Sequence, residues 1–152
     1  MKPFFAIGLR AFIERQEGLR LTAYQDTGGV WTIGYGHTPA RAGQVITLAQ
    51  AHALLDSDIA AAARAVTDLV QVPLTLGRRG ALIDFVFNLG ESALRTSTLL
   101  HLLNGGDYAG ACAQFDRWDH CVVDGRMIAD PGLLRRREDE QWCWNHGFFR
   151  NP

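Results

Sequence analysis

Apolar residues near the start of the chain recur with the period of a helix. Four of them occupy positions i, i+4, i+7 and i+8, which share one helical face: Phe5, Leu9, Phe12 and Ile13. Gly18 follows this pattern, and glycine readily takes the left-handed backbone conformation found just beyond a helix end. The pattern therefore predicts a first helix that ends beside Glu17.

The period changes to two in the next segment, residues 21–35. Short extended runs flank the tetrapeptide Asp26-Thr27-Gly28-Gly29, which consists of turn-forming residues. In the second run large side chains alternate with smaller ones, so Thr32 projects from the face opposite Trp31 and Ile33. A small antiparallel hairpin is expected, and Gly34-Tyr35-Gly36 ends it because glycine weakens strand interiors.

A long helix is predicted from Thr47 to Leu69. Thr47 and Gln50 have the spacing of a capping box, in which each side chain binds the backbone N–H of the other residue. The run that follows contains neither glycine nor proline. Six of its apolar residues form one stripe: Leu48, Ala51, Leu55, Ile59, Ala62 and Val66. A helix of this length spans roughly 30 Å, which is enough to link two lobes.

The rest of the chain has a helical period with short interruptions. Helices are predicted over 76–89, over 96–103, over 108–118 and from Pro131-Gly132 to Trp144. Residues 119–130 are expected to be irregular, with a short extended excursion at Val122-Val123. The predicted fold class is therefore α+β. A single domain would comprise a small β lobe over 19–46, a linking helix over 47–69, and a helical lobe formed by 1–18 and 70–152.

Composition narrows the classes of protein to consider. The 152 residues, 47% hydrophobic and 20% charged, suffice for one globular domain with a sizeable core. Basic and acidic residues nearly balance, and the net charge of -1 argues against a dedicated nucleic-acid binder. The apolar run from Phe4 to Leu9 is too short for a signal peptide, and no window reaches the roughly 18 apolar residues of a membrane helix. We therefore expect a soluble protein without an export signal.

Cysteines and histidines do not indicate a metal centre. The three cysteines, Cys112, Cys121 and Cys143, lack CxxC spacing and are interpreted as core or surface thiols. One disulfide pair stays open as an alternative if the protein reaches an oxidising space. The five histidines are scattered and show no metal-binding spacing such as HExxH. We expect no metal and no cofactor.

The candidate chemistry is concentrated between residues 17 and 38. Glu17, in the last turn of a helix, faces the negative end of the helix dipole, which favours its protonated form and suits a general acid. Asp26 lies at the hairpin turn, and two carboxylates in unlike environments are typical of glycoside hydrolysis. Thr32 can hold a water by hydrogen bonding. Simpler interpretations stay open: Glu17 as a solvated residue, Asp26 as a turn residue bonded to its own backbone, and His37 as a structural group.

The joint spacing Glu17-x8-Asp26-x5-Thr32, which ends in Thr-Ile-Gly-Tyr-Gly-His, resembles the phage-type lysozymes, the endolysin family. Three further segments are similar to the family: Ala-Leu-Ile-Asp-Phe-Val-Phe-Asn-Leu-Gly at 81–90, Arg117-Trp118, and Gly-Leu-Leu-Arg-Arg-Arg-Glu at 132–138. The resemblance covers nearly the whole chain. It implies a lysozyme-like fold with an active-site cleft between the β lobe and the helical lobe.

The resemblance also implies a reaction. The protein would be a muramidase that hydrolyses the β-1,4 bond between N-acetylmuramic acid and N-acetylglucosamine in peptidoglycan. Glu17 would be the general acid, while Asp26 and Thr32 would position and activate the attacking water in a single displacement that inverts the anomeric carbon. His37 would support the site structurally.

Further site residues follow from the same resemblance. The family's cleft positions carry over as three substrate-binding residues: Thr38, Phe87 and Thr98. For Phe87 a place in the core is an equally open interpretation. In the family an arginine of the C-terminal segment pairs with the catalytic glutamate. Arg136 and Arg137 are expected to support the site in this way, with Arg135 as a third candidate.

The family implies peptidoglycan as the partner, no nucleic acid, no stable membrane insertion and a monomer. The protein would be made in the host cytoplasm, released by a holin-type membrane pore protein and active on the wall in the periplasm, where it causes host lysis. Two other readings compete. A lytic transglycosylase uses a single acid and forms an anhydro product without water, and a wall-binding protein would use an inactive lysozyme scaffold. The filled positions Asp26 and Thr32 favour the hydrolase.

Overall fold

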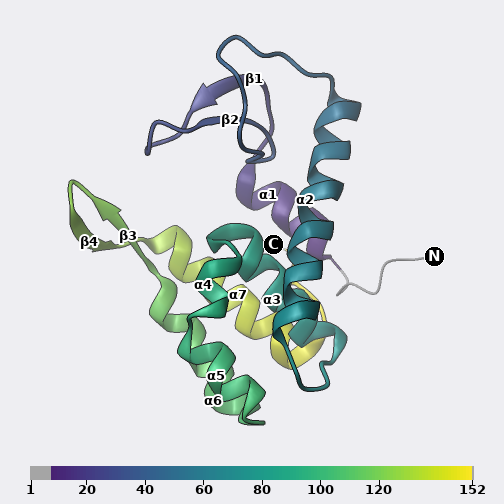
Figure 1. Cartoon of the computed structure of the whole chain (residues 1–152), viewed down its shortest axis with the longest axis vertical. Coiled ribbons are helices and arrows are strands. Elements are labelled where there is room, and N and C mark those ends of the chain that lie inside the picture. Colours follow the sequence, from purple (N-terminus) through teal and green to yellow (C-terminus); the bar gives the residue numbers. More distant parts are fainter. Residues whose placement is uncertain (1–7, 152) are drawn as a thin grey trace. The chain divides into compact units, whose positions relative to one another are not determined.

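The computed structural model describes residues 8–151, and the chain forms two compact units (Figure 1). Arg10–Ala61 make up one unit, and Ala62–Pro152 together with Met1–Leu9 make up the other. The chain passes from the first unit to the second within the helix α2, Leu48–Leu69. The predicted helical position Phe5 lies outside the described residues.

The helix α1, Leu9–Glu17, leads into the unit Arg10–Ala61. Gly18 follows it with a φ of 67°, and the Gly18 N–H donates to the Glu14 carbonyl oxygen at 3.0 Å. This bond closes the last turn, so the helix ends at Glu17 as predicted, because glycine tolerates the left-handed conformation. Phe12 and Ile13, which were predicted on the apolar face, are buried.

A two-stranded antiparallel sheet follows, with β1 at Arg20–Gln25 and β2 at Trp31–Gly34. Tyr24 pairs with Thr32 across the ladder. The predicted hairpin and its turn are therefore confirmed. Thr32 is 4% exposed and Ile33 is fully buried, so both faces of β2 are covered.

The capping box at the start of α2 is present. The Thr47 N–H donates to Gln50 Oε1 at 2.8 Å, and the Gln50 N–H donates to Thr47 Oγ1 at 3.2 Å. Leu48, in the first turn of the helix, is 48% exposed, against the prediction that it belongs to the apolar stripe. The remaining stripe residues are buried: Ala51, Leu55, Ile59, Ala62 and Val66.

The second unit is mainly helical. After the last part of α2 its elements are α3 (Leu76–Leu89), α4 (Glu91–Arg95), α5 (Thr98–Asn104), α6 (Tyr108–Ala113), the 3-10 helix η1 (Gln114–Trp118), β3 (His120–Val123), β4 (Arg126–Ala129) and α7 (Pro131–His146). Within this unit α3 and α7 lie side by side (Figure 1). Gly77 permits their close approach, because a Cβ on this residue would lie 2.2 Å from the Cys143 carbonyl oxygen.

Aromatic rings fill the space between α3, η1 and α7. Phe85 packs edge to face against Phe115 and Trp118, with ring centroids 5.7 Å and 5.2 Å apart. Phe115 in turn packs against Trp144 at 5.7 Å. Edge-to-face pairs of this kind stabilise a core beyond their buried area, so these four rings hold the helical unit together.

Two predicted helices differ in their limits. Ser97 caps α5 by accepting a hydrogen bond from the Leu100 N–H at 3.0 Å, so this helix begins at Thr98 rather than at Thr96. The short helix α4, Glu91–Arg95, precedes it and was not predicted. The helix expected over 108–118 is α-helical only to Ala113 and continues as η1.

The prediction of an irregular segment over 119–130 is wrong, although the extended excursion predicted at Val122-Val123 is confirmed as part of β3. β3 and β4 form a regular antiparallel hairpin in which Val122 pairs with Met127 and Val123 with Arg126. Asp124 and Gly125 connect the strands with φ values of 49° and 73°. Two left-handed residues make a turn whose twist matches that of the strands, and Asp-Gly favours such a turn.

Helices and two small antiparallel sheets together confirm the predicted α+β class. Within residues 8–151, no helix combines the length and the apolar character that crossing a membrane requires. The division into a β lobe, a linking helix and a helical lobe stays a prediction.

Candidate active site

Glu17, the last residue of α1, places its carboxyl group against Gly36. A Cβ built on Gly36 would lie 2.9 Å from Glu17 Oε2 and 3.5 Å from the carboxyl carbon. The φ of Gly36 is 77°, a conformation that side chains with a Cβ rarely adopt. Both the backbone and the available space therefore require glycine beside the carboxyl group of Glu17.

The turn that carries Gly36 is closed by backbone hydrogen bonds and attached to α2. The Ile33 N–H donates to the His37 carbonyl oxygen at 3.0 Å, and the His37 N–H donates to that of Ile33 at 2.9 Å. Nδ1 of His37 lies 2.8 Å from Oδ2 of Asp58 on α2. The two side chains are 24% and 30% exposed. This contact fixes the turn, and with it the wall beside Glu17, to the long helix.

Asp26 starts the turn between β1 and β2. Its Oδ1 accepts hydrogen bonds from the N–H groups of Gly28 and Val30, both at 2.9 Å. The interpretation of Asp26 as a turn residue bonded to its own backbone is therefore confirmed. The residue is exposed, and its Oδ2 makes no hydrogen bond with the described residues, so the turn uses one carboxylate oxygen and leaves the other accessible.

Thr32 and Asp26 are held by the same peptide group. The Thr32 hydroxyl donates to the Val30 carbonyl oxygen at 3.1 Å. That oxygen also accepts the N–H of Asp26 at 3.0 Å. Because the hydroxyl donates to Val30, the lone pairs of Thr32 Oγ1 are left as acceptors. The hairpin thus presents a carboxylate oxygen and a hydroxyl oxygen in a fixed relationship, as the positioning of a water molecule requires.

The predicted substrate-binding residues belong to both units. Thr38 is exposed and precedes Pro39 in the unit Arg10–Ala61. Phe87 is half-buried on α3, and Thr98 is the exposed first residue of α5. Their contact with substrate stays a prediction, and partial burial leaves both interpretations of Phe87 open.

The three consecutive arginines of α7 have different environments. Arg135 is exposed, whereas Arg136 and Arg137 are buried. Arg136 binds Asp84 of α3 at two points, with Nε 2.9 Å from Oδ2 and Nη2 2.7 Å from Oδ1. Two-point pairing of this kind is both directional and strong. The pairing of one of these arginines with Glu17 stays a prediction.

Arg137 belongs to the same buried cluster. Its Nη2 donates to Asn88 Oδ1 at 2.9 Å and to Glu140 Oε1 at 2.8 Å. Burial raises the pKa of Glu140 well above its ordinary value of 4.5, against the attraction of Arg137. Burial also disfavours the ionised form of Asp84, but the two-point contact with Arg136 outweighs burial and lowers the pKa of that carboxyl. The two shifts therefore favour the ionised form of Asp84 and the protonated form of Glu140.

The cysteines are free thiols, as interpreted from the sequence. Burial raises the pKa of Cys143 to about 12, and its thiol donates to the Gly77 carbonyl oxygen at 3.5 Å. Burial also raises the pKa of Cys112. Since the thiolate is the reactive form, neither suits a nucleophile. In the part of the chain that the structure describes, no three His, Cys, Asp or Glu side chains are grouped as metal ligands.

Sequence reasoning missed the roles of Gly36 and Asp58. Gly36 was predicted only as a residue that ends a strand, and its contact with Glu17 joins a turn to a helix that precedes the whole hairpin. Asp58 carried a local signal: it lies three residues after Leu55 and directly before Ile59. An acidic residue at the edge of an apolar stripe is expected to have a partner when the stripe is buried.

Comparison with known proteins identifies the family that this chain resembles. The family model described as phage lysozyme matches residues 14–140. An endolysin of Acyrthosiphon pisum secondary endosymbiont phage 1 is 48% identical over 130 residues, which are 85% of this chain and 89% of that protein. The SAR-endolysin of Enterobacteria phage PA-2 is 40% identical over 127 residues, 82% of this chain and 74% of that protein.

Solved structures give the same result. The muramidase domain of SpmX from Asticaccaulis excentricus superposes with a TM-score of 0.82 at 37% identity and covers 90% of this chain and 94% of its own. An endolysin from Escherichia coli O157:H7 phage FAHEc1 has a TM-score of 0.85 at 30% identity, and the match covers 94% of both chains.

Proposed function

The chain belongs to the phage lysozyme family, and we propose that Glu17 is the general acid of its reaction, with Asp26 and Thr32 holding the attacking water. The chain is a lysozyme, a hydrolase that acts on peptidoglycan, and it has the lysozyme-like fold predicted from the sequence. The proposal concerns the catalytic roles of these three residues.

In the proposed reaction the Glu17 carboxyl group donates its proton to the glycosidic oxygen between N-acetylmuramic acid and N-acetylglucosamine. Asp26 accepts a proton from a water molecule, and the oxygen of that water attacks the anomeric carbon as the bond to the leaving sugar breaks. Thr32 accepts the second hydrogen bond of the water. Because attack and departure occur on opposite faces, the anomeric configuration is inverted.

The observation that carries the proposal is the shared Val30 peptide group. Its carbonyl oxygen accepts the N–H of Asp26 at 3.0 Å and the hydroxyl of Thr32 at 3.1 Å, so one peptide group binds both residues. The turn needs the Asp26 side chain but not the Thr32 hydroxyl. The shared peptide group therefore supports a water held between the Asp26 carboxylate and the Thr32 hydroxyl oxygen. A lytic transglycosylase, which uses no water, would not need this arrangement.

Replacement of the proposed acid tests the assignment. Glu17→Gln keeps the shape of the side chain but has no proton to donate, and we expect activity to fall by about 10²-fold to 10⁴-fold. Clearing of chloroform-treated Gram-negative cells, followed by turbidity, measures the loss. Glu14→Gln is the matched control on the same helix, since Glu14 accepts a hydrogen bond from Arg10 at 3.1 Å and has no proposed part in catalysis. A Glu17→Gln variant that clears cells like the wild type would contradict the role.

Product analysis by mass spectrometry and NMR accompanies this test. A hydrolase leaves reducing N-acetylmuramic acid ends, and inversion makes the first product the α anomer. Anhydromuramic ends would overturn the hydrolase mechanism, and an initial β anomer would overturn the single displacement.

For the biology of the chain we propose the course suggested by its similarity to endolysins. The monomeric enzyme is made in the host cytoplasm, reaches the wall in the periplasm through a holin-type membrane pore protein and lyses the host for phage release. The support for this course is the endolysin relatives themselves.

A further inference from the structure

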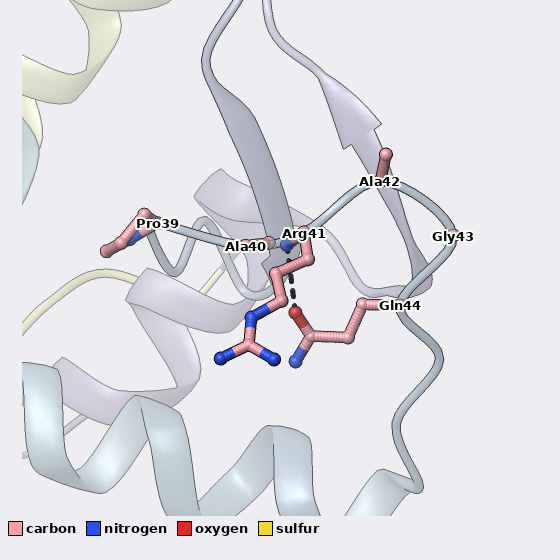
Figure 2. A pocket seen from close by; sticks show the side chains of 6 residues that line it. All are labelled: Pro39, Ala40, Arg41, Ala42, Gly43 and Gln44. Atoms are coloured by element: carbon pink, nitrogen blue, oxygen red, sulfur yellow. Dashed lines mark hydrogen bonds between the residues drawn. The ribbon is translucent and has the colours of Figure 1, made fainter.

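Residues 39–44, between the β hairpin and α2, line an open hollow of about 740 Å³ within the unit Arg10–Ala61. Its lining consists of Pro39, Ala40, Arg41, Ala42, Gly43 and Gln44. Figure 2 shows the guanidinium group of Arg41 and the carboxamide of Gln44 on the same side of this loop, whereas the methyl group of Ala42 points away. The volume is in the range of pockets that bind small molecules.

The loop is anchored at both of its ends. The Ala40 N–H donates to the Trp31 carbonyl oxygen of β2 at 2.9 Å, and the Gln44 carbonyl oxygen accepts the N–H of Ala23 on β1 at 2.9 Å. Inside the loop the Gln44 N–H donates to the Arg41 carbonyl oxygen at 3.0 Å. These bonds form the hollow before any ligand arrives, which lowers the entropic cost of binding.

The polar groups in the hollow are hydrogen-bond donors. Gln44 Oε1 accepts the backbone N–H of Arg41 at 3.0 Å, which fixes the orientation of the amide and leaves its NH₂ group as the outward donor. The guanidinium group of Arg41 makes no hydrogen bond or ion pair with any described residue. Two donor groups, one of them cationic, therefore share a loop whose six residues include no acid.

Several other charged residues of this unit have partners among the described residues. Arg10 binds both Glu14 and Asp56, and the Arg20 guanidinium lies 4.7 Å from the centre of the Tyr24 ring. Asp58 binds His37 and Asp56 binds Arg10, so neither of these two acids of α2 is paired with Arg41.

We propose that the hollow binds a carboxylate on the peptide branches that peptidoglycan carries on its N-acetylmuramic acid residues. A guanidinium group matches the two oxygens of a carboxylate, and the neighbouring amide adds a third donor. The proposal rests on the proposed function, because the peptide branches belong to the same peptidoglycan polymer whose sugar chain Glu17 is proposed to cleave. In intact peptidoglycan the lactyl carboxyl group of each substituted N-acetylmuramic acid is tied up in the amide bond to its peptide branch, so the free carboxylates recognised are those of the peptide branches.

Kinetics on two substrates test the proposal. Arg41→Gln removes the charge and the fork of donors, and we expect the half-saturating concentration of intact murein sacculi to rise about fivefold to tenfold with kcat unchanged. On sacculi whose peptide carboxylates have been converted to amides, wild type and variant should have the same half-saturating concentration. Arg64→Gln removes an equal charge from an exposed position on α2 that does not line the hollow, and it should match the wild type on both substrates.

Binding of a soluble peptide gives a readout that needs no catalysis. The muramyl-type branch peptide with free carboxylates should shift the NMR signals of the Arg41 side chain and of residues 39–44, and the same peptide with its carboxylates amidated should not. Arg41→Gln should abolish the shifts while the melting temperature stays unchanged, since the Arg41 side chain is exposed and its guanidinium group makes no hydrogen bond or ion pair with a described residue.

The outcomes separate the two proposals. If Arg41→Gln changes the kinetics on both substrates equally, or on neither, the hollow does not recognise peptides although the enzyme is a muramidase. If the wild type hydrolyses neither substrate, the proposed function fails. The peptide-binding experiment then tests by itself whether the hollow binds a carboxylate.

Discussion

Gly36 and Glu17 are in direct contact: the position that a Cβ of residue 36 would occupy lies 2.9 Å from Oε2 of the glutamate. The contact makes a backbone glycine part of the wall around a carboxyl group. The contact is supported from behind by the His37–Asp58 pair, at 2.8 Å. The geometry of the proposed acid thus depends on residues that touch no substrate.

Gly36→Ala should lower kcat by more than about tenfold and the free energy of unfolding by about 1–2 kcal/mol, since the methyl group displaces the Glu17 carboxyl group and φ is positive. Gly106→Ala is the matched control: its φ is 85°, yet nothing lies within 4 Å of the added Cβ. It should lose similar stability and keep its kcat. Equal kcat losses in both variants would contradict the contact as the cause.

Asp26→Asn should separate the turn role of this residue from its proposed catalytic role. Asparagine keeps an oxygen for the N–H groups of Gly28 and Val30, so the free energy of unfolding should change by less than about 1 kcal/mol. Without a carboxylate to take a proton from water, kcat should fall by about 10²-fold or more with little change in KM. Urea unfolding and initial rates measure the two effects. A variant that is unstable but catalytically intact would leave Asp26 as a turn residue only.

Asp58→Asn should lower the free energy of unfolding by about 1 kcal/mol, because the partly buried pair with His37 loses its charge. A neighbouring acid on the same helix provides the control: Asp56 pairs with Arg10 at exposed positions, 62% and 42% accessible. Asp56→Asn should cost less than about 0.5 kcal/mol. Thermal unfolding monitored by circular dichroism distinguishes the two, and equal losses would contradict the special position of the His37–Asp58 pair.

Glu140→Gln should flatten the dependence of stability on pH. The pKa of Glu140 is raised in the folded state, so folding retains a proton that the unfolded chain loses. The stabilisation is therefore complete below the ordinary value of 4.5 and declines as pH rises above it, at up to about 1.4 kcal/mol per pH unit. The lowered pKa of Asp84 acts in the opposite direction, and its contribution is lost only as pH falls below the ordinary value of 3.8.

Urea unfolding at about pH 5, 6 and 7 therefore isolates Glu140 from Asp84. The wild type should lose stability across this range, and Glu140→Gln should lose less. If the two proteins show the same slope, the proton does not reside on Glu140. Asp84→Asn is expected to be strongly destabilising at every pH in the range, since it removes the charge from the two-point pairing with the buried Arg136.

Local sequence patterns predicted much of the fold because the interactions they describe are short in range. The capping box of Thr47 and Gln50, the left-handed Gly18 and the turn at Asp26 each involve residues within four positions of one another. Local patterns did not predict the hairpin at Asp124-Gly125, although Asp-Gly favours a tight turn. They also did not predict the exposure of Leu48, because the burial of that residue depends on which elements pack against the first turn of α2.

For the candidate site, the sequence by itself determined the residues proposed to carry the chemistry, Glu17, Asp26 and Thr32, through their spacing and its resemblance to the family. Only the tertiary structure decided how they are held. The contact of Gly36 with Glu17, the bond from His37 to Asp58, and the buried pairing of Arg136 with Asp84 join residues that are far apart along the chain. Side-chain periodicity does not record such contacts, because they arise when the hydrophobic faces of separate elements pack and bring polar groups together out of water.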